Sequence, residues 1–315
     1  MIDKYIIGVD GGGSKTEAVS TNLCGKLLKN SISGSVNINS VGIEKAKRNL
    51  IKCLEDVKFN HIAEVCIIGA AGLENERNRL ALMEAVNETY AKKTILTSDA
   101  KILYETVKNR GNVIVLICGT GSIAYTELNG IKLRTGGWGY LLGDEGGGFW
   151  IAKKAIMKML KEYDEGKNPS NLSMKIMKFY RINNPPQIIE KVYGGDISEI
   201  ARLAEEIAKV CDEEEDIDAI EIIDEAGIEL AKIVKTLIKK SGINEWEVHC
   251  TGGLFNTSKR LFEKIKMEIE KTHPKVKVVK CMFRGIAGAI IMGLNEIGIK
   301  VNNDIISNLM VWAHA

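Results

Sequence analysis

The chain has 315 residues, of which 45% are hydrophobic and 27% charged, and its 43 Lys and Arg nearly balance its 41 Asp and Glu. The net charge of +2 gives no basis for binding nucleic acid or an anionic membrane, so we expect neither as a partner. Because no apolar run is long enough to span a bilayer and the N-terminus lacks an apolar signal-type segment, we expect a cytoplasmic protein.

The first part of the chain has the pattern of an α/β domain. Strands are predicted near 4–9, 15–21, 26–33, 64–69 and 93–97, and helices over 42–58, 74–90 and 99–109. Gly111-Asn112 then breaks the pattern, so we expect an N-terminal domain over residues 1–110.

The second part repeats the strand-rich opening and then becomes helical. Strands are predicted near 113–118, 122–127, 130–135, 246–250 and 276–281. Helices are predicted from about Glu145 to Lys161 and over 201–211, 216–241, 256–271, 284–297 and 303–313. Short helices and loops are expected over 164–200, where three of the four prolines lie. We therefore expect a C-terminal domain over 111–297 with a helical insert at about 150–240.

The segment GVDGGGSKT, at residues 8–16, carries the first functional signal. It is neither a Walker A loop, because Ser14 takes the lysine position, nor a dinucleotide fingerprint, because Thr16 takes the third glycine position. Backbone amides of a glycine hairpin can bind phosphate oxygens, and Asp10 can bind Mg²⁺ through water. The candidate phosphate-binding residues are Gly11, Gly12, Gly13, Ser14, Lys15 and Thr16. The alternative is a plain hairpin with no ligand.

Two further turns follow strands in the second part. Cys118-Gly119-Thr120-Gly121-Ser122 connects two predicted strands, and Thr251-Gly252-Gly253 ends a third. Repeated glycine turns at strand ends are less easily explained as chance than a single one. We therefore add Gly119, Thr120, Gly121, Gly252 and Gly253 to the candidate ATP-binding residues.

This ordered set of turns resembles the sugar kinase, actin and Hsp70 ATPase superfamily. The string GGWGYLLGDEG at 136–146 resembles the N-acetylglucosamine kinases and the BadF/BadG/BcrA/BcrD ATPase family, and Thr97-Ser98-Asp99-Ala100 matches the family's catalytic aspartate. The resemblance covers about residues 4–295. It implies an α/β fold of two actin-like (ribonuclease H-like) domains with a nucleotide cleft between them, and a last helix, within 298–315, that packs back on the first domain.

The resemblance also implies an activity. The protein is expected to use ATP and Mg²⁺ to phosphorylate an amino sugar: N-acetylglucosamine, glucosamine or a murein sugar such as N-acetylmuramic acid. Asp99 is expected to act as the general base. The expected sugar-binding residues are Asn37, Asp99, Trp138, Gly139, Asp144 and Glu145. A homodimer is the expected assembly.

Plainer explanations stay open for several of these residues. Asp99 is also typical of a helix N-cap, Trp138 of core packing and Glu145 of an acid in the first turn of a helix. Ile123 departs from the animal kinases, which carry an asparagine there, so the exact sugar is left open. Two other functions are alternatives: an ATPase activator of a 2-hydroxyacyl-CoA dehydratase type system, with an intersubunit [4Fe–4S] cluster to which Cys118 could contribute, and a non-catalytic sugar sensor.

Overall fold

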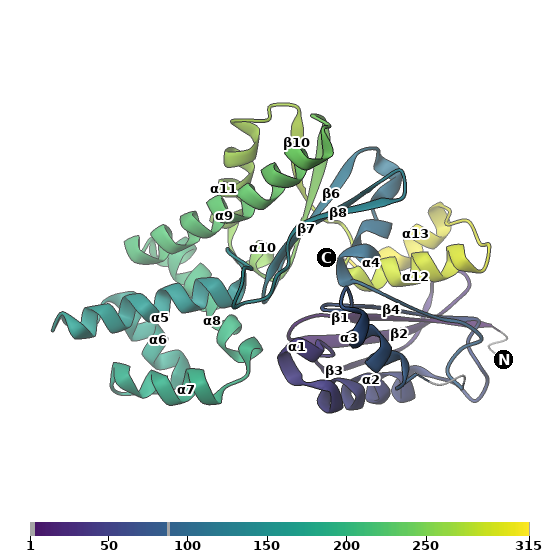
Figure 1. Ribbon diagram of the computed structural model, residues 1–315, viewed down its shortest axis with the longest axis horizontal. Coiled ribbons are helices and arrows are strands. Elements are labelled where there is room, and N and C mark those ends of the chain that lie inside the picture. The colour runs from purple at the N-terminus through teal and green to yellow at the C-terminus, as the bar shows by residue number, and fades with distance from the viewer. Residues whose placement is uncertain (1–3, 87–88, 315) are drawn as a thin grey trace. The chain divides into compact units, whose positions relative to one another are not determined.

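A computed structural model describes residues 4–86 and 89–314. The chain forms two compact units, Met1–Arg110 with Cys281–Ala315, and Gly111–Lys280 (Figure 1). Each unit contains one five-stranded mixed sheet. The first unit is therefore built from both ends of the chain, and the second from one continuous segment.

The sheet of the first unit has the strand order β3-β2-β1-β4-β5. Its strands are β1 (Tyr5–Gly11), β2 (Lys15–Asn22), β3 (Leu27–Gly34), β4 (Val65–Ala70) and β5 (Thr94–Thr97). Strands β1, β4 and β5 are parallel, whereas β2 is antiparallel to β1 and to β3. The carboxyl ends of β1, β4 and β5 therefore lie at one edge of the sheet, where ligands bind in many α/β proteins.

Helices cover both faces of this sheet. They are α1 (Ile38–Val41), α2 (Ile43–Val57), α3 (Glu76–Met83), α4 (Asp99–Glu105), the 3-10 helix η1 (Lys108–Arg110), α12 (Gly285–Glu296) and α13 (Asn303–Met310). Leu50 and Leu54 of α2 share a buried cluster with Ile7, and Ile290 of α12 shares another with Ile6. The alternation of side chains along β1 thus sends successive residues into two different cores.

The second unit repeats the same sheet topology, in the order β10-β9-β6-β7-β8. Its strands are β6 (Val113–Cys118), β7 (Ser122–Leu128), β8 (Ile131–Gly136), β9 (Trp246–Thr251) and β10 (Val276–Lys280). Here β6, β9 and β10 are parallel and β7 is antiparallel to both neighbours. The strand-turn-strand opening predicted twice from the sequence is therefore the first half of each sheet.

The helices of the second unit build a large apolar core with the sheet. They are α5 (Gly148–Asp164), α6 (Asn171–Tyr180), η2 (Pro185–Gln187), α7 (Ile188–Gly194), α8 (Ile197–Glu214), α9 (Ile217–Ser241), α10 (Leu254–Thr257) and α11 (Lys259–Glu270). Five of them, α5 to α9, lie in the segment of about 150–240 in which the sequence predicted a helical insert (Figure 1).

Several helix boundaries differ from the expectation, among them the following three. The helix expected from Glu145 begins at Gly148, because Asp144 and Gly146 take positive φ values of 60° and 76° that interrupt a right-handed helix. The helix expected over 256–271 is split at Ser258, whose extended backbone ends α10 and whose hydroxyl accepts from the Leu261 amide to cap α11. The helix expected over 74–90 covers Glu76–Met83, and residues 87 and 88 of that range lie outside the described residues.

The segment 281–297, which we expected in the second domain, packs in the first unit. Helix α12 contacts β1, β4 and α4, and a Cβ on its Gly288 would lie 1.6 Å from the carbonyl oxygen of Ile102. Only glycine therefore allows this approach. The chain end follows: Asn308 Nδ2 donates to Cys24 O (2.8 Å) and Trp312 Nε1 to Gly25 O (3.1 Å).

Candidate functional site: two glycine turns and an aspartate pair

The candidate site of the first unit is built around Asp10, at the carboxyl end of β1. The side chain of Asp10 lies on the α12 face of the sheet, where a Cβ on Gly285 would lie 2.6 Å from its Oδ2. Burial, and then the nearby carboxylates of Asp99 and Glu17, raise the pKa of Asp10 to about 7, against the weaker opposing effect of Arg284 and Lys15. This carboxylate is therefore costly to ionise without a cation beside it.

Asp99 is the second acid at this edge. It is the first residue of α4, and the helix cap is its neighbour Ser98, whose hydroxyl accepts from the Lys101 amide (3.2 Å). Asp99 Oδ1 accepts from the Ala100 amide (2.9 Å), which fixes the direction of the carboxylate. The N-cap explanation of Asp99 is therefore wrong, since Ser98 does that work.

The hairpin after Asp10 is closed by the Gly12 amide, which donates to Lys15 O (2.9 Å) and leaves Gly13 and Ser14 at the tip. None of Gly11 to Gly13 has a positive φ. Gly11 is required for packing, because a Cβ there would lie 2.3 Å from Val36 Cγ2, whereas a Cβ on Gly12 would meet only Lys15 O at 3.5 Å. The open side of the hairpin is thus at its tip.

Thr16 does not fit the phosphate-binding role that we expected for its side chain. It is fully buried on the face of the sheet that α2 covers, where Cys53 Sγ donates to its carbonyl oxygen (3.8 Å). Asp10 points to the other face. The structure therefore keeps the Thr16 hydroxyl away from Asp10.

A group of asparagines adjoins the same edge. Asn37 caps α1 by accepting from the Asn39 amide (3.1 Å), and a Cβ on Gly72, just past β4, would lie 2.8 Å from its Oδ1. Asn78 Nδ2 donates to Asn39 Oδ1 (3.0 Å) and to Gly72 O (3.2 Å). Asn37 is thus held at the end of β4, between the strands that lead to Asp10 and Asp99.

The candidate site of the second unit is built around the turn after β6. Its carbonyls are bound by the start of α5: the Gly148 amide donates to Gly119 O (2.8 Å) and the Phe149 amide to Thr120 O (3.0 Å). A Cβ on Gly121 would lie 2.0 Å from Asp144 Oδ2. Glycine at 121 therefore lets the turn and the acidic loop touch.

The turn after β9 lies against the same place. Gly252 has a φ of 133°, and a Cβ on it would lie 1.8 Å from Cys118 O, whereas a Cβ on Gly253 would meet only Glu205 Oε1 at 3.5 Å. Three glycine-rich segments of the second unit thus form one contiguous structure at the carboxyl edge of β6 and β9. They are residues 119–121, 144–147 and 252–253.

Asp144 organises the loop that carries Trp138. Its Oδ1 accepts from the Gly139 amide (3.3 Å), and the Ser122 hydroxyl donates to Glu145 O (2.8 Å). Burial raises the pKa of Asp144, although hydrogen bonds from the Gly139 and Ser122 backbones oppose this. Glu145 itself is exposed and lies before α5, so the explanation of a first-turn helix acid is wrong.

Trp138 is 63% exposed, so core packing does not explain it. The Arg134 guanidinium lies 4.1 Å from the centre of its ring, an arrangement that stabilises an exposed indole. Ile123 supports the same loop, because its Cδ1 would lie 2.8 Å from a Cβ on Gly137. Ile123 therefore holds this loop in place.

Sequence reasoning missed Glu17 and Arg284. Glu17 is opposite Asp10 in the β1–β2 register and forms an ion pair with Arg284, which directly precedes α12. Arg284 Nη2 also donates to Trp312 O (2.7 Å). The alternation of β2 could have placed Glu17 on the Asp10 face, but only the fold brings Arg284 there.

The residues fit Mg²⁺ bound together with a nucleotide. Among the described residues, no group of three or more His, Cys, Asp or Glu side chains could hold a metal ion. Mg²⁺ keeps several waters and is usually bound by one or two carboxylates plus phosphate oxygens. Asp10, a carboxylate with a raised pKa beside a glycine hairpin, meets that requirement without a protein cage.

Two α/β units with equal strand order and a glycine turn at each sheet edge define the actin-like sugar kinase fold. Residues 7–293 match the BadF/BadG/BcrA/BcrD ATPase family, and the chain belongs to this family. Of the helices in the described part of the chain, none combines the length and the apolar character needed to cross a bilayer.

Two curated relatives match almost end to end. The N-acetylmuramic acid/N-acetylglucosamine kinase of Clostridium acetobutylicum is 31% identical over 304 residues, covering 93% of this chain and 99% of the relative. The N-acetyl-D-glucosamine kinase of Dictyostelium discoideum is 26% identical over 322 residues, covering 94% and 99%.

Solved structures share the fold. A candidate N-acetylglucosamine kinase from Chromobacterium violaceum has a TM-score of 0.74 at 21% identity and covers 92% of this chain and 98% of its own. A ROK family glucokinase from Streptomyces griseus, solved with glucose and AMPPNP, has a TM-score of 0.60 at 14% identity, covering 93% and 98%.

Proposed function

We propose that the protein is an ATP-dependent kinase that phosphorylates a hydroxyl group of an amino sugar. The observation that carries the proposal is the position of Asp10 and Asp99 at the same carboxyl edge of one sheet, at the end of β1 and directly after β5. The relatives from Clostridium acetobutylicum and Dictyostelium discoideum, both amino-sugar kinases, support the substrate class.

The two acids take different roles in this proposal. Asp99, at a helix start with its direction fixed by the Ala100 amide, orients the sugar hydroxyl and accepts its proton. Asp10 binds the waters of Mg²⁺. When bound, Mg·ATP supplies the phosphoryl group and neutralises the charge that develops during transfer.

The glycine turns bind and orient the phosphates. We assign this role to the tip of the first hairpin, at Gly12, Gly13 and Ser14, and to the turn Gly119–Gly121. Thr16 contributes through its backbone only, because its side chain is buried. Gly253, beside which a Cβ would meet only Glu205 Oε1 at 3.5 Å, is proposed to lie along the adenosine.

The sugar is proposed to contact Asn37 and Asp99 on the first unit and Trp138, Gly139 and Glu145 on the second. Asp144 acts indirectly, since its carboxylate is bound to the Gly139 amide and fixes the Trp138 loop. A murein sugar and N-acetylglucosamine are both within the proposed class.

Cys118 is unsuited to bind an iron–sulfur cluster. Its thiol is fully buried and donates to Gly146 O (3.4 Å), and burial raises its pKa to about 12, whereas cluster ligation needs a thiolate. This observation counts against the dehydratase-activator alternative.

The test is a coupled ATP-turnover screen over hexoses, amino sugars and N-acetylmuramic acid, with the product identified by mass spectrometry. We expect turnover with at least one amino sugar, an 80 Da mass gain on that sugar, and little ATP hydrolysis without it. ATP hydrolysis that no sugar stimulates, with no phosphorylated sugar formed, would refute the proposal.

A further inference from the structure

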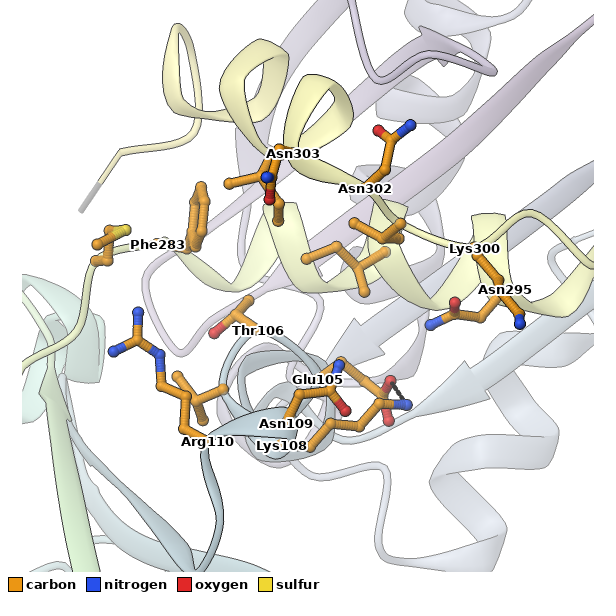
Figure 2. A pocket seen from close by; sticks show the side chains of 15 residues that line it. Glu105, Thr106, Lys108, Asn109, Arg110, Phe283, Asn295, Lys300, Asn302 and Asn303 are labelled. Carbon is orange, nitrogen blue, oxygen red and sulfur yellow. Dashed lines mark ion pairs between the residues drawn. The ribbon is translucent and has the colours of Figure 1, made fainter.

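The first unit contains a cavity away from the candidate site, built by the end of α4 that is opposite to Asp99. Its volume is about 480 Å³, within the range of small-molecule sites. The end of α4 and the segment 106–110 form one wall, and the residues before α13 form another (Figure 2). None of the residues assigned to ATP, Mg²⁺ or sugar above is among the described residues that line it.

Positive charge dominates the lining. Lys108, Arg110 and Lys300 contribute three cations, and Glu105 is the only acid among the described lining residues. Glu105 is 7% exposed and forms ion pairs with Lys101 (2.8 Å) as well as with Lys108 (2.6 Å), so its charge is already compensated. Arg110 and Lys300 are exposed and are labelled on opposite sides of the cavity in Figure 2.

Most of the remaining lining residues are of two kinds. Hydroxyl-binding carboxamides come from Asn109, Asn295, Asn302 and Asn303. Apolar surface comes from Val107, Phe283, Ile291, Val301 and Ile306. Cations that can bind a phosphate, carboxamides that can bind hydroxyls, and an apolar wall for the face of a ring together match one chemical class.

We propose that this cavity binds a small phosphate monoester that carries several hydroxyl groups, such as a sugar phosphate. The inference rests on the proposed function, because that reaction would make a ligand of this class. The cavity would then give the enzyme a second site for its own kind of product.

The position of the cavity suggests regulation. The chain leaves the first unit after Arg110 and re-enters it at Cys281, and both Arg110 and Met282 line the cavity. A ligand would therefore touch both connecting segments at once. Binding would restrict these segments and so lower turnover without competing with the sugar substrate.

The experiment is calorimetric titration of the full-length protein with N-acetylglucosamine 6-phosphate, inorganic phosphate and N-acetylglucosamine. The test variant is R110Q/K300Q, and the control is K52Q, an exposed lysine on α2 outside the cavity. Removing two charged hydrogen-bond donors should lower the affinity for the sugar phosphate by about tenfold or more, and the affinity for inorganic phosphate by less. Binding of the uncharged sugar should be unchanged.

Initial-rate kinetics on the same proteins tests the regulatory part. The sugar phosphate should inhibit the wild-type and K52Q proteins, and excess sugar substrate should not relieve this inhibition. Inhibition of R110Q/K300Q should be weak. Should the double variant fold poorly by circular dichroism, K300E, at an exposed loop residue, replaces it. Equal affinity in test and control variants would refute the site, and binding without any effect on turnover would refute regulation. Failure of the kinase proposal is distinguishable, since wild-type protein would then phosphorylate no sugar.

Discussion

The two units have the same strand order but use the residue before the glycine turn in opposite ways. In the first unit this residue is Asp10, whose pKa burial and neighbouring acids raise to about 7. In the second it is Cys118, a buried thiol bonded to Gly146 O. At the first edge, ionisation of Asp10 is unfavourable unless a cation lies beside it. At the second edge, the thiol of Cys118 is buried and already hydrogen-bonded. The same topology thus places a buried acid in one unit and a buried thiol in the other, and we propose that the first takes part in the reaction and the second supports the turn.

The largest expected effect is on turnover and comes from removing the proposed base, Asp99. Asp99→Asn should lower kcat by about 10²- to 10⁴-fold, the usual contribution of a positioned base, with little change in thermal stability. Steady-state kinetics and thermal unfolding measure both. The control is Asp304→Asn, another acid in a first helical turn, which should leave both unchanged. Near-normal turnover of the Asp99 variant would remove the base from the proposal.

A substitution at the edge of the second sheet should lower the stability of the protein instead of acting on the chemical step. Gly252→Ala should cost about 3 kcal/mol or more, because Gly252 has a φ of 133° and a new Cβ would lie 1.8 Å from Cys118 O. Gly119→Ala is the matched control, since no atom lies within 4 Å of its added Cβ. Denaturant unfolding distinguishes them, and equal losses would show that the contact between the two turns is unimportant.

Asp10→Asn should separate activity from stability. Because the folded protein raises the pKa of Asp10 to about 7, its protonated carboxyl group favours folding; this contribution is complete below the ordinary pKa and is lost as the pH rises through about 7. The variant should therefore be more stable than wild type at pH 8, by up to about 4 kcal/mol, and equal to it near pH 4, when measured without metal. Thermal unfolding across pH measures this difference.

The same variant should lose activity. Mg²⁺ must displace the proton of Asp10, so the Mg²⁺ requirement of wild-type turnover should rise about tenfold per pH unit below pH 7 and level off above it. Asp10→Asn should show about 10- to 100-fold lower turnover and no such pH dependence. A wild-type Mg²⁺ requirement that is constant from pH 5.5 to 8.5 would exclude Asp10 from the metal site.

The smallest expected effect concerns the exposed loop of the second unit. Trp138→Ala should raise the KM for the sugar by about tenfold, the value of about 1.4 kcal/mol of lost ring contact, and leave the free energy of unfolding nearly unchanged. Tyr193→Ala, which removes a ring that is 87% exposed elsewhere in the same unit, is the control. A stability loss without a KM change would make Trp138 a packing residue.

Much of the fold and part of the candidate site could be predicted from the sequence, because hydrophobic periodicity and glycine spacing are local signals. Both strand-turn-strand openings and the Asp99 junction were predicted on that basis. The burial of the Thr16 side chain was missed because it depends on the register between β1 and β2. That register places Thr16 opposite Gly11, on the α2 face of the sheet. The pairing of Arg284 with Glu17 was missed because it joins residues 267 positions apart. The need for glycine at position 11 was missed for the same reason, because it comes from packing against Val36, which is distant in the sequence.

The discontinuous first unit has a consequence for biosynthesis. The face of its sheet that carries Ile6 and Ile67 is covered by Ile286 and Ile290 of α12. Those residues leave the ribosome only after the whole second unit, residues 111–280, has been made. The second unit can thus fold while the first still exposes an apolar face, and nascent chains that stall before residue 285 should bind chaperones or aggregate through that face.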